Sequence, residues 1–361
     1  MLQGGMGKTT ALCAMTLAMV FNPDIGKVFG SGPTHVAINN FAGRLYQRGA
    51  AVVERYNAGK NGDGPRARRP LVVRGFKLRD EIGAFKNILK SGVADNAAAP
   101  KFPWSPPSRW TYALSATNWL LVLLKSDAAK KSRSGTAVTE LDLDDSASMH
   151  ELQADVDQSP DWARARELVS GKISWAEYNK GQVLDGDKIG SRLIAIINSA
   201  DIVLTTPATS ESDNVYAAAK NKAKGIVIDE AGCLSRADLC SVWGNTLRPL
   251  VLAGDALQLR PTAMERRNRF QKDLQFSALA FLQASGLPVY RLRTQLRMCT
   301  DMFGAARSLV YKDLDKFQYG PDCDPSGPTH DIGHKFEHWL LHVRKFPGLR
   351  PSRPNTLEPV W

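Results

Sequence analysis

Two short apolar runs that end in carboxylates constrain the fold of this chain more than any other feature. Residues 226–228 are Ile-Val-Ile, and Asp229 and Glu230 follow them directly. Residues 249–253 are a second apolar run, which a Gly-Asp pair closes. Short apolar runs bounded by turn residues are typical of parallel strands covered on both faces. Because ligands of open parallel sheets bind at the carboxyl ends of the strands, we expect these carboxylates to handle a metal ion and a phosphate.

The beginning of the chain contains a candidate phosphate-binding segment that would complete such a site. Residues 7–9, Gly-Lys-Thr, match the end of a phosphate-binding loop, and residues 11–21 after them are predicted to form a helix. Such a loop needs glycines, so that backbone N–H groups turn toward the phosphates, and then Lys and Thr at a helix start. Leu2 stands where the pattern has its first glycine. Taken with the carboxylates after residues 226–228, the match indicates a nucleotide site.

Two further segments are predicted to add strands to the same sheet. Residues 27–40 are interpreted as a short strand, a Gly-Pro turn and a helix that is capped near Thr34 and runs through Arg48. Residues 200–206 are predicted to be a buried strand whose two final threonines lie on the same sheet edge as Asp229. Two interpretations stay open for the turns that follow these two strands. The turns are ordinary connections, or their N–H groups and hydroxyls hold the phosphates of a nucleic-acid strand.

The middle of the chain, residues 49–199, is predicted to be a mostly helical insertion. Residues 110–124 and 161–199 have helical patterns, whereas residues 126–160 are polar and contain an acidic cluster. We expect that polar stretch to be flexible, since nothing in the sequence fixes its carboxylates together. Residues 59–70 form an arginine-rich loop that either contacts a phosphate backbone or, as we favour, is simply solvated.

Composition narrows the class of protein. The net charge of +11 favours a polyanionic partner, although many basic proteins carry such a charge for solubility. The five cysteines are scattered and form no CxxC pair, which predicts reduced intracellular thiols rather than a disulfide framework or a zinc site. The sequence has no apolar run long enough to span a bilayer, so no membrane partner is expected.

The last part of the chain is predicted to contain a helix at residues 270–285, a short strand at 289–292 and an amphipathic helix at 302–311. A row of histidines then recurs every four residues, a spacing that lines one face of a helix. These are His330, His334, His338 and His342. A metal site would need a further ligand, and no acidic one is evident, so a solvated or partner-facing helix is the favoured interpretation.

In combination, these motifs resemble superfamily 1 helicases of the nonsense-decay and senataxin-like group. The resemblance rests on six short segments in the order of that family, at residues 4–10, 33–39, 201–206, 229–231, 254–261 and 295–298. Leu296 stands where tyrosine is usual in the last segment. The resemblance implies an α/β fold of the P-loop NTPase (RecA-like) type, a parallel sheet with a mostly helical insertion.

It also implies a division into domains. Residues 1–48 and 200–300 would form a RecA-like ATPase domain that flanks the insertion 49–199, with its flexible stretch near 126–160. Residues 301–361 would begin a second RecA-like domain. The later motifs of that family, including the arginine finger, have no counterpart in the sequence. We therefore expect a truncated helicase chain, with a protein partner as one way to complete the ATP cleft.

ATP and Mg²⁺ are the cofactors that the resemblance implies. The residues expected to contact them are Gly4, Gly5, Gly7, Lys8, Thr9, Thr10, Asp229 and Glu230. Thr9 and Asp229 would hold Mg²⁺, and Lys8 would cradle the β- and γ-phosphates. The residues expected to act in catalysis are Lys8, Glu230 as general base, Gln258 as sensor of the γ-phosphate, and Arg297 as the cation on the transferring phosphoryl.

The expected macromolecular partner is single-stranded DNA or RNA, because backbone contacts do not distinguish the sugar. The residues expected to follow that strand are Pro33, Thr34, His35, Asn39, Thr205 and Thr206. The function implied is an ATP-dependent helicase, or a fragment of one, in the nucleus or cytoplasm. The alternative is a hydrolysis-deficient P-loop protein that binds nucleotide or nucleic acid, or scaffolds partners, without unwinding.

Overall fold

The computed structural model describes residues 6–60, 65–103, 106–132, 136–262, 269–300 and 302–352. The chain divides into two compact units. The sheet unit comprises Leu12–Phe281, and the small unit comprises the described parts of Met1–Ala11 and Leu282–Trp361.

A five-stranded parallel sheet forms the centre of the sheet unit, with the strand order β2-β3-β1-β4-β5. The strands are β1 (Val28–Ser31), β2 (Val72–Arg74), β3 (Ile202–Thr205), β4 (Gly225–Ile228) and β5 (Leu250–Leu252). Ser31 at the end of the central strand lies opposite Thr205 on one side and Ile228 on the other. The predicted α/β class, its parallel sheet and the four predicted strands are confirmed.

The edge strand β2 was not predicted, and it comes from within residues 49–199. Its backbone is tied to β3 by the register of Val72 with Ile202, and the side chains of β2 are fully buried. Three residues are too short a run to carry a periodic signal, so the strand is defined only by its distant partner.

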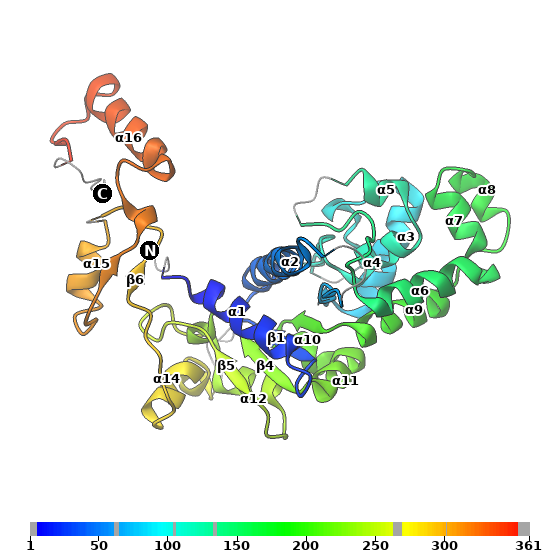
Figure 1. Cartoon of the computed structure of the whole chain (residues 1–361), viewed down its shortest axis with the longest axis horizontal. Helices are drawn as coiled ribbons and strands as arrows, with labels where there is room; N and C mark the ends of the chain where they lie inside the picture. Colours follow the sequence, from blue (N-terminus) through cyan, green and yellow to red (C-terminus); the bar gives the residue numbers. More distant parts are fainter. Residues whose placement is uncertain are drawn as a thin grey trace. The chain divides into compact units, whose positions relative to one another are not determined.

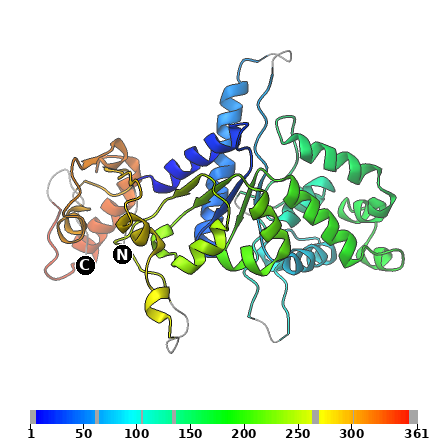
Figure 2. The same cartoon turned by 90° about the horizontal axis from the view of Figure 1, so that it is seen from below.

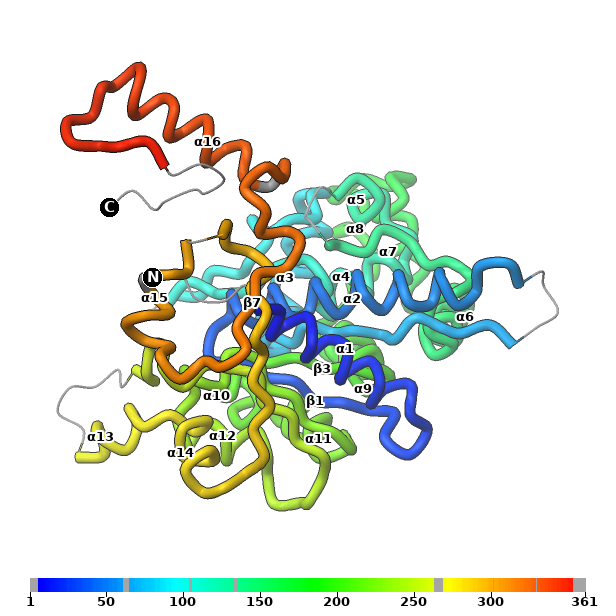
Figure 3. Tube along the Cα trace, turned by 60° about the vertical axis from the view of Figure 1, so that its left-hand side comes forward, coloured from blue at the N-terminus to red at the C-terminus, as the bar shows by residue number. Residues whose placement is uncertain are grey.

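Helices α1 (Lys8–Phe21) and α2 (His35–Asn57) lie on one side of the sheet, and helices α10 (Pro207–Ser212), α11 (Asn214–Lys222) and α12 (Arg236–Trp243) lie on the other (Figure 1). Figure 3 traces the chain through α1 in dark blue and α2 in lighter blue. The predicted cap at Thr34 is confirmed, because its side chain accepts a hydrogen bond from the backbone N–H of Ala37. The helix runs beyond the predicted end and continues through Gly49 to Asn57, and Gly49 lies beside Leu17 of α1.

The rest of residues 49–199 is mostly helical. Its helices are α3 (Leu78–Ser91), η1 (Asn96–Ala98), α4 (Ala116–Leu123), α5 (Asp127–Lys130), α6 (Ala147–Gln158), η2 (Pro160–Trp162), α7 (Ala163–Val169), α8 (Trp175–Asn179) and α9 (Gly186–Ser199). The predicted helix at 110–124 starts later than expected. Ser115 caps α4, and the residues just before it form a turn, in which the carbonyl of Leu114 accepts the N–H of Arg74.

The acidic cluster near residue 144 is held by the arginine-rich loop, so the expectation that nothing fixes its carboxylates was wrong. Arg66 makes a bidentate ion pair with Asp144, with N–O distances of 2.9 and 2.8 Å. Arg69 pairs with Asp142 and lies 3.4 Å from a carboxylate oxygen of Asp145. The loop and the cluster neutralise each other, which leaves these two arginines without the free charge that a phosphate contact needs.

The end of the sheet unit contains two short helices in place of the single helix predicted at 270–285. They are α13 (Gln271–Leu274) and α14 (Ala278–Ala284). The break has a local cause, because Ser277 forms an antiparallel bridge with Ser235 and the N–H of Ala278 donates to the carbonyl of Leu234.

The small unit is built around a two-stranded parallel ladder of β6 (Thr294–Gln295) and β7 (Gln318–Tyr319). Its other elements are α15 (Gly304–Leu309), η4 (Pro321–Cys323), η5 (Pro328–His330) and α16 (Asp331–His338), which continues into a π-helical turn at Trp339–Val343. Figure 2 draws α15 and α16 in orange and red. The strand predicted at 289–292 is wrong, since the ladder begins at Thr294. Among the described helices, none combines the length and apolar character that crossing a membrane requires.

Candidate functional site

The end of β4 places two carboxylates at the carboxyl edge of the sheet. The backbone N–H of Asp229 donates to the carbonyl of Ser31 at 3.0 Å, which extends the ladder one residue beyond β4. The side chain of Asp229 is buried, and it accepts the backbone N–H of Glu230 at 3.0 Å. Glu230 has φ 52° and ψ 38°, a left-handed conformation that few residues with a Cβ adopt. Strain of this kind is typical of functional turns that the surrounding structure holds in place.

A close backbone contact holds that turn against the next one. The N–H of Ala231 donates to the carbonyl of Ala253 at 2.9 Å. A Cβ on Gly232 would come within 2.1 Å of the carbonyl oxygen of Asp255, and one on Gly254 within 2.5 Å of the nitrogen of Gly232. The turns after β4 and β5 therefore touch through bare backbone, at a distance that only glycine permits.

Gln258 is held in the turn after β5. Its side-chain nitrogen donates to Asp255 at 3.3 Å, and its backbone N–H donates to the carbonyl of the same residue. The other carboxylate oxygen of Asp255 accepts the N–H of Leu257 at 2.9 Å. Asp255 thus organises the turn, and the structure brings Gln258 to the same sheet edge as the carboxylates of β4.

The body of α1 also lies near the end of β4. Cys13 in this helix is buried, and burial raises the pKa of its thiol to about 12, with the negative charge of Asp229 adding to the rise. The effect of a charge on another group falls off with distance, so the influence of Asp229 on this thiol indicates that the two groups are neighbours. The helix that follows the phosphate-binding loop is therefore packed at the edge where the Asp-Glu pair emerges.

Lys8 and Thr9 open α1 and belong, with Arg297, to the small unit. Gly7 has φ +77°, the conformation that a phosphate-binding loop requires before its lysine, and its Cα faces a side-chain carbon of Leu296, which a built Cβ would approach to 3.3 Å. The small unit thus brings the end of the loop beside Leu296, the residue that stands where tyrosine is usual. Thr10 is exposed, and the predicted residues Gly4 and Gly5 lie outside the described residues.

Gln295 shapes the segment that presents Arg297, and its role was not predicted. The side-chain oxygen of Gln295 accepts the backbone N–H groups of Leu296, Arg297 and Met298 at 3.1, 3.0 and 3.3 Å. Arg297 itself is exposed, and no ion pair joins it to any residue in the described ranges. The glutamine that opens the segment was visible in the sequence, but only the folded turn shows that it gathers three donors.

The predicted strand-binding residues collect at the other half of the sheet edge, where β1 and β3 end. Thr34 and Thr206 each use the side-chain oxygen to cap a helix, α2 and α10 respectively. Thr205 is fully buried, and within the described part of the chain its hydroxyl has no hydrogen-bond partner. Pro33 is half-buried in the turn before α2. The threonines therefore fix the local backbone first, and any contact to a strand is left mainly to the beginning of α2.

A buried arginine at the end of β2, which the sequence analysis did not single out, contacts two of the predicted strand-binding residues. Arg74 is 1% exposed, and burial lowers its pKa to about 10. Its Nε donates to Oδ1 of Asn39 at 2.8 Å, and its Nη2 lies 2.9 Å from Nδ1 of His35. Its guanidinium also lies over the ring of Phe76, 4.1 Å from the centroid. The structure thus joins two predicted strand-binding residues through a third residue from an unpredicted strand.

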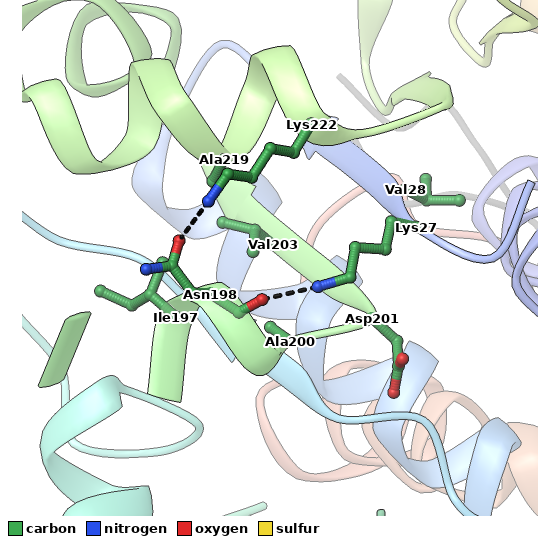
Figure 4. Close-up of a pocket in the computed structure, with 9 residues that line it drawn as sticks. All are labelled: Lys27, Val28, Ile197, Asn198, Ala200, Asp201, Val203, Ala219 and Lys222. Atoms are coloured by element: carbon green, nitrogen blue, oxygen red, sulfur yellow. Dashed lines mark hydrogen bonds between the residues drawn. The ribbon is translucent and has the colours of Figure 1, made fainter. Parts of the chain in front are cut away.

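A small pocket lies at the opposite edge of the sheet, where β1 and β3 begin (Figure 4). Its two lysines, Lys27 and Lys222, donate to the backbone and side-chain oxygens of Asn198 at 2.6 and 3.4 Å. Both cations are engaged inside the pocket, and it lies at the end of the strands where open parallel sheets do not bind nucleotides.

The histidine row does not assemble a metal centre. Nε2 of His330 and of His334 lies 3.0 and 2.8 Å from a backbone carbonyl oxygen. The rings of His338 and His342 lie with centroids 4.5 Å apart, where α16 turns into its π-helical segment. In the part of the chain that the structure describes, no group of three or more metal-ligating side chains converges.

A parallel sheet with an Asp-Glu pair at the end of an inner strand, next to a helix that opens with Gly-Lys-Thr, defines a P-loop NTPase fold. A family model described as an AAA domain matches residues 1–266, and the chain belongs to that family. It is a domain family of superfamily 1 helicases of the nonsense-decay and senataxin-like group, as the ordered motifs implied. No curated protein matches the chain.

Proposed function

We propose that this helicase-like ATPase domain hydrolyses ATP and couples the hydrolysis to binding of, and movement along, single-stranded nucleic acid. The observation that supports the proposal most is the shared sheet edge. Ser31 ends β1, and its backbone carbonyl accepts the N–H of Asp229 while its hydroxyl donates to the carbonyl of Thr205. One residue is thus bonded to both halves of the edge, at 3.0 and 2.8 Å, which gives a short path for coupling.

On the nucleotide side, the residues fit Mg-ATP by their chemistry. Thr9 and Asp229 have the hydroxyl and carboxylate oxygens that Mg²⁺ prefers and would hold the ion, which would supply positive charge for the β- and γ-phosphates. Lys8 and the N–H groups beside Gly7 bind the same phosphates. Glu230 accepts the proton of the attacking water on its carboxylate, and its left-handed backbone fixes where that side chain leaves the turn.

Two further groups act on the γ-phosphoryl in this proposal. Arg297 donates N–H groups to the phosphoryl oxygens, where negative charge concentrates, and its exposure leaves the guanidinium available. Gln258 contacts the γ-phosphate, and the hydrogen bond from its side chain to Asp255 links that contact to the turn after β5.

On the strand side, the beginning of α2 meets the sugar-phosphate backbone. His35 and Asn39 are half-buried polar side chains on the first turns of that helix. Contacts of this kind carry no sequence information, so binding without base preference is expected for either RNA or DNA.

The test is ATP hydrolysis by the purified chain with and without a single-stranded oligonucleotide. We expect turnover that the strand stimulates, and a loss of about a hundredfold or more for Glu230→Gln, the size of a general-base contribution. Lys8→Ala should also abolish nucleotide binding. Glu151→Gln removes an exposed carboxylate of α6 and should leave turnover unchanged. Nucleotide binding that depends on Lys8, without any turnover, would instead identify a hydrolysis-deficient P-loop protein.

A further inference from the structure

The guanidinium of Arg74 fixes which atoms of two neighbouring side chains face outward. A guanidinium carries only donors and stays protonated in proteins. The atom of Asn39 that lies 2.8 Å from Nε of Arg74 must therefore be its oxygen. The amide nitrogen of Asn39 then points away from the arginine, and the structure gives that nitrogen no partner among the described residues.

The same argument fixes the tautomer of His35. Nδ1 of this ring lies 2.9 Å from Nη2 of Arg74, so Nδ1 accepts and the ring proton resides on Nε2. Burial lowers the pKa of His35 to about 4, and the positive charges of Arg74 and Arg109 add to that shift. The ring is therefore neutral at physiological pH and offers one N–H donor, for which no partner exists within the described ranges.

Arg74 itself is unavailable to a ligand. Its Nη1 donates to the backbone carbonyl of Gly75 and lies 3.3 Å from that of Leu204. The ring of Phe76 lies against its guanidinium, and the side chain has almost no exposed surface. The charge of Arg74 therefore interacts with groups inside the protein and not with a ligand. The arginine acts on the surface only through the two side chains that it orients.

We propose that Arg74 is a positioning residue of the strand-binding edge: it occupies the acceptor atoms of His35 and Asn39, so that both present N–H donors to the phosphate oxygens of a single strand. The inference rests on the proposed function. It adds a residue from β2 to that site. It also predicts that the surface offers hydrogen-bond donors, and not acceptors, to the strand.

A substitution that reverses this polarity without removing the arginine's partner tests the proposal directly. Asn39→Asp keeps an oxygen for Nε of Arg74 and turns the outward amide into an acceptor. We expect affinity for a fluorescein-labelled oligouridine or oligothymidine to fall by about tenfold or more, because one charge-assisted hydrogen bond is replaced by repulsion. Asn40→Asp is the matched control, since it adds the same charge at the next, exposed position of α2 and should weaken binding only about two- to threefold.

The arginine is tested separately. Arg74→Met should weaken strand binding about tenfold, while Arg74→Lys, which keeps a single cationic nitrogen as donor, should recover part of the loss. Arg248→Met is the control for general damage, because Arg248 also binds backbone carbonyls, those of Lys220, Ala223 and Trp243, but lies before β5 at the opposite edge. It should leave strand affinity unchanged.

A spectroscopic readout reports the mechanism independently of binding. With ¹⁵N-labelled histidine, and His35→Gln to assign the signal, the wild-type ring should show a protonated Nε2 at neutral pH. Arg74→Met should lose this preference, whereas Arg248→Met should keep it.

Three results would overturn the inference. They are equal affinity of wild type and Asn39→Asp, equal losses for Asn39→Asp and Asn40→Asp, or a His35 ring protonated on Nδ1. A wild-type chain that binds no single strand at all would overturn the proposed function and this inference together, and the strand-free ATP hydrolysis rate would then show what remains of the nucleotide site.

Discussion

The two halves of the sheet edge are held together in different ways. At β4 and β5, backbone meets backbone, with Gly232 and Gly254 in contact that admits no side chain. At β1, β2 and β3, the parts are joined by a buried side chain, Arg74, which reaches His35 and Asn39 in another element. The first half carries the proposed hydrolysis chemistry and the second the proposed strand contacts.

This difference predicts that the half held by backbone contacts tolerates few substitutions, whereas the half held by a side chain can be altered in steps. Backbone contacts leave no room for substitution, and they hold Glu230 in a conformation that would otherwise relax. The hydrogen bonds of a side chain such as Arg74 can be weakened in steps by substitution. Such substitutions can also change whether His35 and Asn39 offer donors or acceptors to a ligand. We expect substitutions in the first half to affect stability and turnover together, and those in the second half to affect strand affinity alone.

The largest effect is expected where backbone meets backbone. Gly254→Ala would place a Cβ 2.5 Å from the nitrogen of Gly232, and neither backbone segment can move without breaking the ladder. We expect a loss of about 3 kcal/mol in the free energy of unfolding, measured with urea. Gly186→Ala, whose Cβ would meet nothing closer than 3.8 Å, is the control and should be neutral. A neutral Gly254→Ala would show that the two turns are not locked.

The second effect concerns a buried carboxyl on α3, which belongs to neither half of the sheet edge. Glu81 is fully buried, and burial raises its pKa to about 7, against hydrogen bonds from Thr117, Trp110 and Ala116. Since the folded pKa exceeds the unfolded value, the folded state binds the extra proton between roughly pH 4.5 and 7, and stability falls as pH rises through that window.

Comparison with Glu81→Gln isolates this term. The free energy of unfolding of the wild type, relative to the variant, should fall by on the order of 3 kcal/mol between pH 4.5 and 7.5, as urea denaturation at several pH values would show. A difference that does not depend on pH would mean that Glu81 has the same pKa in both states.

A smaller effect is expected from the strain at Glu230. Glu230→Gly and Glu230→Ala remove the same carboxylate, but only glycine adopts φ 52° without steric cost. The glycine variant should be the more stable of the two by about 1 kcal/mol in urea denaturation, while both lose turnover. Equal stabilities would mean that the turn relaxes once the side chain is gone.

The smallest effect is predicted at the arginine-rich loop. Arg66 is committed to Asp144, and that pairing holds the pKa of the carboxyl below its ordinary value. Arg66→Ala should therefore change affinity for a single strand by less than about twofold, measured by fluorescence anisotropy. A loss of affinity as large as that of Asn39→Asp would mean that this loop is part of the strand-binding surface.

The sequence was most informative where the backbone geometry of a turn or loop restricts which residues can form it. Apolar runs that end in carboxylates predicted β4 and β5, and the Gly-Lys-Thr triplet predicted the start of α1. Such motifs are legible because a tight turn or a phosphate loop restricts the residues that can form it.

The other half of the edge could not be foreseen. The strand β2 consists of Val72–Arg74, and its neighbour β3 lies some 130 residues further along the chain. Arg74 is preceded by two valines and resembles an ordinary exposed arginine in sequence; only the pairing with β3 buries it. Gln295 is similar, since its three backbone donors converge only when the segment turns.

The most direct test titrates a single-stranded oligonucleotide against the rate of ATP hydrolysis in the wild type, Asn39→Asp and Glu230→Gln. We predict that Asn39→Asp raises the half-stimulating strand concentration about tenfold and leaves the maximal rate unchanged. Glu230→Gln should lower the maximal rate by about a hundredfold or more and leave strand affinity unchanged. Wild-type hydrolysis that no strand stimulates, or an Asn39→Asp variant that loses maximal rate at an unchanged half-stimulating concentration, would contradict the assignment of the two halves.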